Sequence, residues 1–241
     1  MTRSRAFVGT SGWAYRTWKP RFYPQEVRPR DFLRYYATRL RTLEVNYTFN
    51  HLPTEQNITA WREATPLDFL FALKASQQIT HFRQLREPAD TLPLFFERAR
   101  PLGKRLGPVL FQTPPWLKRD DDRLAGFLGS LPRDMRCALE VRHVSWYVDE
   151  VYELLRTAGV ALVHAEGERA PSPIETLDAT APFVYARLRA REGYDEKAVS
   201  AWAERFRSAL HAGKDVYAYF RHDDDGANAL SAERLRDLLA A

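Results

Sequence analysis

The chain has 241 residues, of which 45% are hydrophobic and 13% aromatic, enough for a large core. Its 36 basic and 31 acidic side chains leave a net charge of +5, which mildly favours anionic partners without indicating nucleic acid. One cysteine, Cys137, excludes an intramolecular disulfide and favours a reducing compartment. With no signal-peptide pattern and no run near the ~18 apolar residues of a membrane span, we expect a cytoplasmic protein without a membrane partner.

Short β-like runs alternate with helical patterns along the chain. The predicted strands are 7–12, 42–49, 69–75, 108–114, 137–143, 161–166, 183–189 and 216–222. The predicted helices are 31–41, 55–64, 91–104, 120–130, 147–158, 196–212 and 229–240, and the Pro-rich segment 167–182 is predicted to be a loop. This alternation predicts an α/β fold, a single (β/α)8 TIM-like barrel over residues 1–241, with an open sheet as the alternative.

Polar residues recur towards the carboxyl ends of six successive predicted strands. In 42–49, for example, Glu44 and Asn46 alternate with Leu43, Val45 and Tyr47. The set is Glu44, Asn46, Lys74, Gln112, Glu140, Arg142, His164 and Arg187. In a barrel these ends share one mouth, where active sites lie, so we expect the side chains to converge there. The alternative is a network of structural salt bridges, such as Glu44 with Lys74 and Glu140 with Arg142, that plugs the barrel.

Several blocks of the sequence resemble a known family. They are "GTSGWAYRTWKPRFYP", "LEVNYTFNHLP", "TPLDFLFALKASQQITH", "LGPVLFQTPPWL" and "LEVRHVSW". Together they resemble the YecE-like family, domain of unknown function 72, from about residue 7 to the final helix. The resemblance implies a TIM-like barrel and carries no activity. The chain departs from the family pattern at Arg189-Ala190, where His-Gly is usual, and at Arg221-His222, where an Asn-rich turn is usual.

The charges of the expected mouth favour an anionic ligand. Lys74, Arg142 and Arg187 outnumber Glu44 and Glu140, so we predict an enzyme for a small anionic or phosphorylated substrate, a hydrolase or isomerase that uses acid–base chemistry. Either glutamate would be the base, His164 a proton donor, the three cations an anion clamp, and Asn46 and Gln112 positioning groups. Arg189, Arg191, Arg221 and the amino end of the last helix would add an anion site.

Three alternatives remain open at this point. Lys74 could form a Schiff base if it lost its proton, although two glutamates oppose that loss. A divalent metal could bind among Glu44, Glu140, His164, His81 and Asp223, although no cofactor is predicted, and "DDDG" at 223–226 fits a turn or helix start better than a calcium loop. The loop that carries Trp13 and Tyr15 mixes aromatic and basic residues, so it could bind substrate or nucleic acid, or simply pack over the barrel end.

Overall fold

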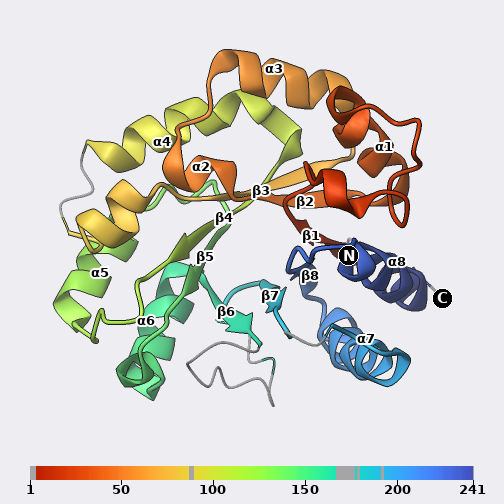
Figure 1. The fold of residues 1–241 in the computed structure, drawn as a ribbon. Helices are drawn as coiled ribbons and strands as arrows, with labels where there is room; N and C mark the ends of the chain where they lie inside the picture. The colour runs from red at the N-terminus through yellow and green to blue at the C-terminus, as the bar shows by residue number, and fades with distance from the viewer. Residues whose placement is uncertain (1–3, 87–89, 167–176, 178–179, 191–192, 241) are drawn as a thin grey trace.

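The computed structural model describes residues 4–86, 90–166, 177, 180–190 and 193–240. Its eight parallel strands form a closed barrel in the order β1 to β8, with β8 paired to β1 through Ala6–Val216 to Thr10–Phe220. Helices surround the strands on the outside (Figure 1). The architecture is therefore the predicted (β/α)8 TIM-like barrel.

The elements follow in strict alternation over most of the chain. The strands are β1 Ala6–Ser11, β2 Thr42–Val45, β3 Leu70–Lys74, β4 Leu106–Gln112, β5 Cys137–Glu140, β6 Ala161–Ala165, β7 Phe183–Leu188 and β8 Asp215–Phe220. The α-helices are α1 Phe32–Arg39, α2 Tyr47–Asn50, α3 Glu55–Ala64, α4 Thr91–Ala99, α5 Asp121–Ser130, α6 Asp149–Ala158, α7 Glu196–His211 and α8 Ala227–Ala240. Most of the predicted loop 167–182 lies outside the described residues.

Two predicted elements end four or more residues before their predicted boundary, and the strand predicted over 137–143 ends three residues early, at Glu140. The strand predicted over 42–49 ends at Val45, because Tyr47–Asn50 turns into α2. The Thr48 hydroxyl donates to the backbone oxygens of Val45 and Lys74, which holds this helix against the end of β3. The helix predicted over 91–104 stops at Ala99, since Pro101 cannot continue its hydrogen bonding and Arg100–Arg105 is a 3-10 segment.

Strand alternation separates two buried layers. Ala72, Leu110, Val163, Tyr185 and Tyr219 belong to a cluster inside the barrel. Their neighbours along each strand instead join the larger core between the strands and the helices. Towards the carboxyl ends of the strands, the residues of this inner face become polar, and these polar residues form the candidate site.

Among the described residues, no helix has the length and apolar character needed to cross a membrane.

Candidate functional site

A buried arginine lies between two buried glutamates at the carboxyl end of the barrel. Arg187, on β7, is 2% exposed, and Glu44 on β2 and Glu140 on β5 are 0% and 4% exposed. Arg187 Nε and Nη2 donate to Glu44 Oε2 and Oε1 at 3.0 and 2.8 Å, and Nη1 donates to Glu140 Oε2 at 2.5 Å. One guanidinium thus bridges both carboxylates, a pairing different from the predicted Glu44–Lys74 and Glu140–Arg142 pairs.

Neutral donors complete the shell of the two carboxylates. Ser11 Oγ and Tyr185 OH donate to Glu44 at 2.6 and 2.8 Å. Gln112 Nε2 donates to Glu140 Oε1 at 2.7 Å. Each carboxylate therefore has a charged and a neutral donor, as buried carboxylates require.

The electrostatics keep Glu140 and Arg187 ionised. Burial disfavours the Glu140 carboxylate, but Arg187, Gln112 and Lys74 together lower its pKa. Burial also disfavours the Arg187 guanidinium, whose pKa is nevertheless raised by Glu140 and Glu44. For Tyr185, burial and the neighbouring Glu44 raise the pKa well above its usual value, so the phenol stays a donor.

Lys74 stands next to this network at the end of β3 and is partly buried. Its Nζ donates to Gln112 Oε1 at 2.8 Å and lies 3.9 Å from the centroid of the Phe49 ring. Burial and Arg187 lower the pKa of Lys74 to about 8, against the opposing effect of both glutamates. The two glutamates do not prevent the shift because Arg187 already neutralises part of their charge.

Two further arginines lie at the rim. Arg142, two residues beyond β5, is near enough to help lower the pKa of Lys74 and of His81. Arg189 follows β7, where the resemblance leads us to expect a histidine, and its Nη2 is 3.7 Å from Glu44 Oε1. Within the described part of the chain, the Nε of Arg189 is buried and makes no hydrogen bond. Lys74 and Arg189 thus set two positive charges against the one net negative charge of the bridged carboxylates.

The predicted position of His164 in the mouth is wrong. Val163 and Ala165 pair in register with Tyr185 and Arg187 and share their inward face, whereas His164 pairs with Ala186. Ala186 belongs to the outer core, so His164 is buried on the helix side of β6. A proton-donor role for His164 in the mouth has no geometric support.

Asn46, Trp13 and Tyr15 lie together, and Tyr15 is near enough to Glu44 for that carboxylate to add to the effect of burial in raising the tyrosine's pKa. They line a hollow of about 370 Å³ with Tyr47 and Trp61. Asn46 stands here because β2 ends before it, so its side chain is not part of the inward row that holds Glu44.

The amino end of α8 is already occupied by carboxylates of the chain. Asp223 accepts from the backbone N–H groups of Gly226 and Asn228, and Asp225 accepts from that of Ala227. The segment 223–226 is thus the predicted helix start, and the expected anion site at this helix end is wrong. Arg191 lies outside the described residues.

Asp223 and His164 are both outside the mouth, so the set considered for a divalent metal does not assemble. Among the described residues, no three His, Cys, Asp or Glu side chains are grouped as metal ligands.

Comparison with known proteins places the chain in a family. The chain matches the family described as "Protein of unknown function DUF72" over residues 7–241. The chain belongs to the DUF72 family. It is 22% identical to the UPF0759 protein YunF of Bacillus subtilis over 97% of this chain and 94% of the relative. It is also 34% identical to the UPF0759 protein YecE of Escherichia coli over 113 residues, which are 46% of this chain and 42% of that relative.

Solved DUF72 structures share the fold. A Thermotoga maritima DUF72 protein has a TM-score of 0.86 at 26% identity, over 98% of this chain and 100% of the other. An Enterococcus faecalis DUF72 protein has a TM-score of 0.79 at 18% identity, over the whole of both chains, and shows the fold alone.

The aromatic loop after β1 is mostly packed into the larger core of this DUF72 protein, outside the barrel strands. Trp18, Phe22 and Tyr23 are almost completely buried, and Tyr23 stacks on Phe32 at 4.1 Å between ring centroids. Large exposed apolar side chains instead follow four successive strands of the barrel. They are Tyr47, Phe82, Trp116 and Val144, at 44%, 63%, 57% and 63% exposure. A nucleic-acid surface would therefore use these loops rather than the first one.

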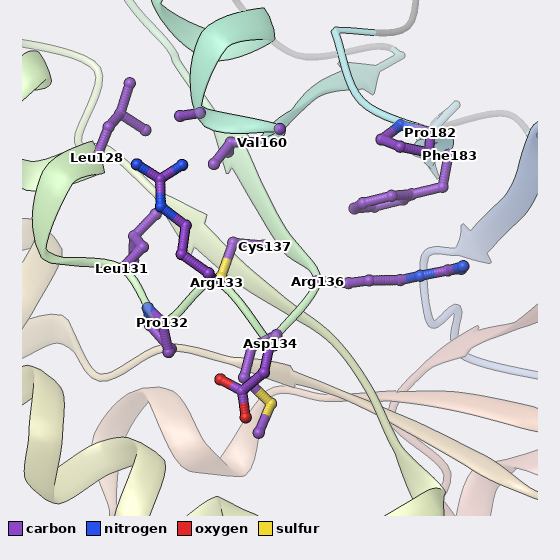
Figure 2. A pocket seen from close by; sticks show the side chains of 13 residues that line it. Leu128, Leu131, Pro132, Arg133, Asp134, Arg136, Cys137, Val160, Pro182 and Phe183 are labelled. Carbon is purple, nitrogen blue, oxygen red and sulfur yellow. The ribbon is translucent and has the colours of Figure 1, made fainter.

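A second cavity, of about 330 Å³, lies at the opposite end of the barrel. Figure 2 shows that residues at or just before the starts of β5, β6 and β7 line it, among them Cys137, Val160 and Phe183. Burial raises the pKa of Cys137 to about 12, so the thiol is protonated and a poor nucleophile. The chemistry of the described residues is therefore concentrated at the carboxyl end.

Two members of the network, Ser11 and Tyr185, are absent from the sequence-based prediction. Tyr185 lies two residues before Arg187, and Ser11 is the last residue of β1 and pairs in register with Glu44. Strand alternation places both on the inner face. The spacing of two residues from Arg187 could have indicated Tyr185, and the position at the end of β1 could have indicated Ser11.

Proposed function

We propose that this DUF72 protein is an enzyme that binds a small anionic substrate at the carboxyl end of the barrel and transforms it by acid–base chemistry. The observation that carries the proposal is the Arg187 bridge. Since Arg187 is engaged by Glu44 and Glu140, the bridge carries one net negative charge, which the charges of Lys74 and Arg189 exceed. An anion relieves this excess in a site of low dielectric.

The roles of the groups differ from those that the sequence suggested. Arg187 holds the two carboxylates in place and is not the main anion ligand, since three of its N–H groups already bind carboxylate oxygens. Arg189 is the anion ligand, since its Nε is buried and makes no hydrogen bond within the described residues. Lys74 is the proton-transfer group, because its pKa of about 8 lets it gain and lose a proton near neutral pH.

The anion site is tested by thermal unfolding in increasing inorganic phosphate. We expect a saturable rise in Tm, because a ligand that binds only the folded state stabilises it by mass action. Arg189→Gln should remove most of the rise. The matched control is Arg100→Gln, which removes an exposed arginine paired with Asp134 on the opposite side of the fold. Equal responses in the two variants would contradict the proposal.

The second candidate is binding of single-stranded nucleic acid without turnover. It is supported by the exposed rings of Tyr47, Phe82 and Trp116 on successive loops, with the exposed Arg86 and Lys118 beside them. Exposed rings stack bases, and cations beside them neutralise phosphates.

This candidate predicts affinity for a single-stranded oligonucleotide that falls steeply with salt. Trp116→Ala should weaken binding about tenfold or more, from the ~1–3 kcal/mol of one base–aromatic stack. Leu67→Ala is the control, because it removes an apolar residue that is even more exposed than Trp116, at 79% against 57%, from the loop before β3. Salt-insensitive or undetectable binding would exclude this candidate.

A further inference from the structure

Lys74 has the surroundings of a nucleophilic amine. Its backbone belongs to the last residue of β3, and its carbonyl accepts from Thr48 Oγ1 at 2.7 Å, so the base of the side chain is fixed. The Phe49 ring packs against Nζ on one side. The amine is therefore held in one place at the inner edge of the mouth while remaining partly accessible.

The hydrogen-bond partner of Nζ is compatible with a neutral amine. Glu140 is an ionised acceptor, so the Gln112 amide must turn its NH₂ group towards Glu140 and its oxygen towards Lys74. A neutral amine can donate one N–H to this oxygen while its lone pair remains available for attack on a carbonyl carbon. A carboxylate at the same place would instead retain the ammonium form.

The charged groups around Nζ come from several strands. Arg187 on β7 and Arg142 beyond β5 disfavour the ammonium, whereas Glu140 and Glu44 favour it. The Phe49 ring also favours the cation. Burial and the arginines prevail, and they lower the pKa of Lys74 to about 8.

We propose that Lys74 forms an imine with the carbonyl group of a small anionic carbonyl compound, whose anionic group binds Arg189. This inference rests on the proposed function, which supplies the anion site, and it names the substrate class. The Nζ lone pair attacks the carbonyl carbon, and the carbonyl oxygen takes a proton to give a carbinolamine. Loss of that hydroxyl with the remaining amine proton, as water, forms the C=N bond.

The test is reductive trapping of the wild-type protein at pH 8 with pyruvate and sodium cyanoborohydride, which reduces the imine to a stable secondary amine. The chain has six lysines, and Lys104, Lys118 and Lys197 are exposed, so peptide mass mapping provides references within each sample. An amine with a pKa of about 8 is half neutral at this pH, against well under 1% for an ordinary lysine. We expect Lys74 to be modified roughly tenfold faster than the three exposed lysines.

Acetone is the matched neutral probe, since it replaces the pyruvate carboxylate by a methyl group. The preference for Lys74 over the exposed lysines should be several-fold larger with pyruvate than with acetone. Arg189→Gln should reduce the pyruvate preference and leave the acetone preference unchanged. An equal preference for both probes would overturn the anionic part of the proposal.

If Lys74 reacts no faster than the exposed lysines with either probe, the imine proposal is wrong. Phosphate binding is measured separately, through Tm. A saturable rise in Tm that depends on Arg189 would therefore support the proposed function even if Lys74 forms no imine. Trapping at Lys74 without a phosphate response would keep the nucleophile and contradict the anion site.

Discussion

Arginine closes both ends of this barrel, but with different partners. At the amino end, Arg136 is 42% exposed at its side chain, donates to Asp215 and to the hydroxyl of Tyr217, and covers the rings of Tyr217 and Phe183. At the carboxyl end, Arg187 is buried between two buried carboxylates. The amino end is thus closed mainly by aromatic packing, whereas the carboxyl end is closed by charged groups that are buried away from water.

The difference matters because burial changes the cost of losing a partner. An exposed ion pair exchanges its partner for water, whereas a buried carboxylate that loses its arginine remains without compensation. The amino end therefore stabilises the fold with little sensitivity to charge. The carboxyl end fixes the positions of charged groups and sets the protonation of its neighbour Lys74.

The largest expected effect is that of Arg187→Met. It leaves Glu44 and Glu140 buried without a counter-charge, so the free energy of unfolding at pH 7 should fall by about 3–5 kcal/mol. Arg136→Met, the matched change at the other end, should cost about 1 kcal/mol. Urea unfolding followed by circular dichroism measures both, and similar losses would mean that the two ends do not differ in this way.

The pH dependence of the free energy of unfolding should have opposite signs in the wild type and in Arg187→Met. In the wild type, the pKa of Glu140 is lowered, so its stabilisation is present above the unfolded pKa of about 4.3 and is lost as pH falls through the folded pKa. In Arg187→Met the carboxyl pKa values should be raised by burial, so the variant gains stability as pH falls from 7 towards 5. We expect the gap from wild type to narrow by about 1–3 kcal/mol, at 1.4 kcal/mol for each unit of pKa change. Parallel stability curves would contradict this.

Removing one tyrosine hydroxyl at each end gives a smaller contrast. Tyr185→Phe removes an O–H that donates to the buried Glu44 carboxylate and should cost about 1–2 kcal/mol. Tyr217→Phe removes an acceptor of Arg136, which keeps Asp215, and should cost about 0.5 kcal/mol. Thermal unfolding at pH 7 measures both, and a larger loss for Tyr217→Phe would reverse the comparison.

Much of the barrel could be predicted from the sequence because strand and helix patterns have different periods. Period-two alternation also predicts that Glu44, Lys74, Gln112, Glu140 and Arg187 point inward near one end, and the structure places all five there. The predicted position of His164 is wrong because the sequence does not distinguish a buried polar residue on the outer face of a strand from one on the inner face. Asn46 lies just beyond the strand that was predicted to hold it, because α2 follows β2 at once.

The pairing within the mouth could not be predicted. Arg187 reaches Glu44 and Glu140 across the barrel, and that reach depends on strand tilt and stagger, which single strands do not encode. The sequence therefore favours local pairs such as Glu140 with Arg142. It also leaves out Tyr185, whose hydroxyl becomes important only once Glu44 is known to face it.

The role proposed for Arg187 is to neutralise the two glutamates and so to let Lys74 lose its proton near neutral pH. The direct measurement is the pH titration of Lys74 by NMR of ¹³Cε-labelled lysine, with the signal assigned by Lys74→Arg. We predict a pKa of about 8 in the wild type and a clear rise in a folded Arg187→Met variant, since a cation is lost and two carboxylates are freed. A wild-type pKa near the usual ~10.4 of lysine, or no change in Arg187→Met, would contradict the claim.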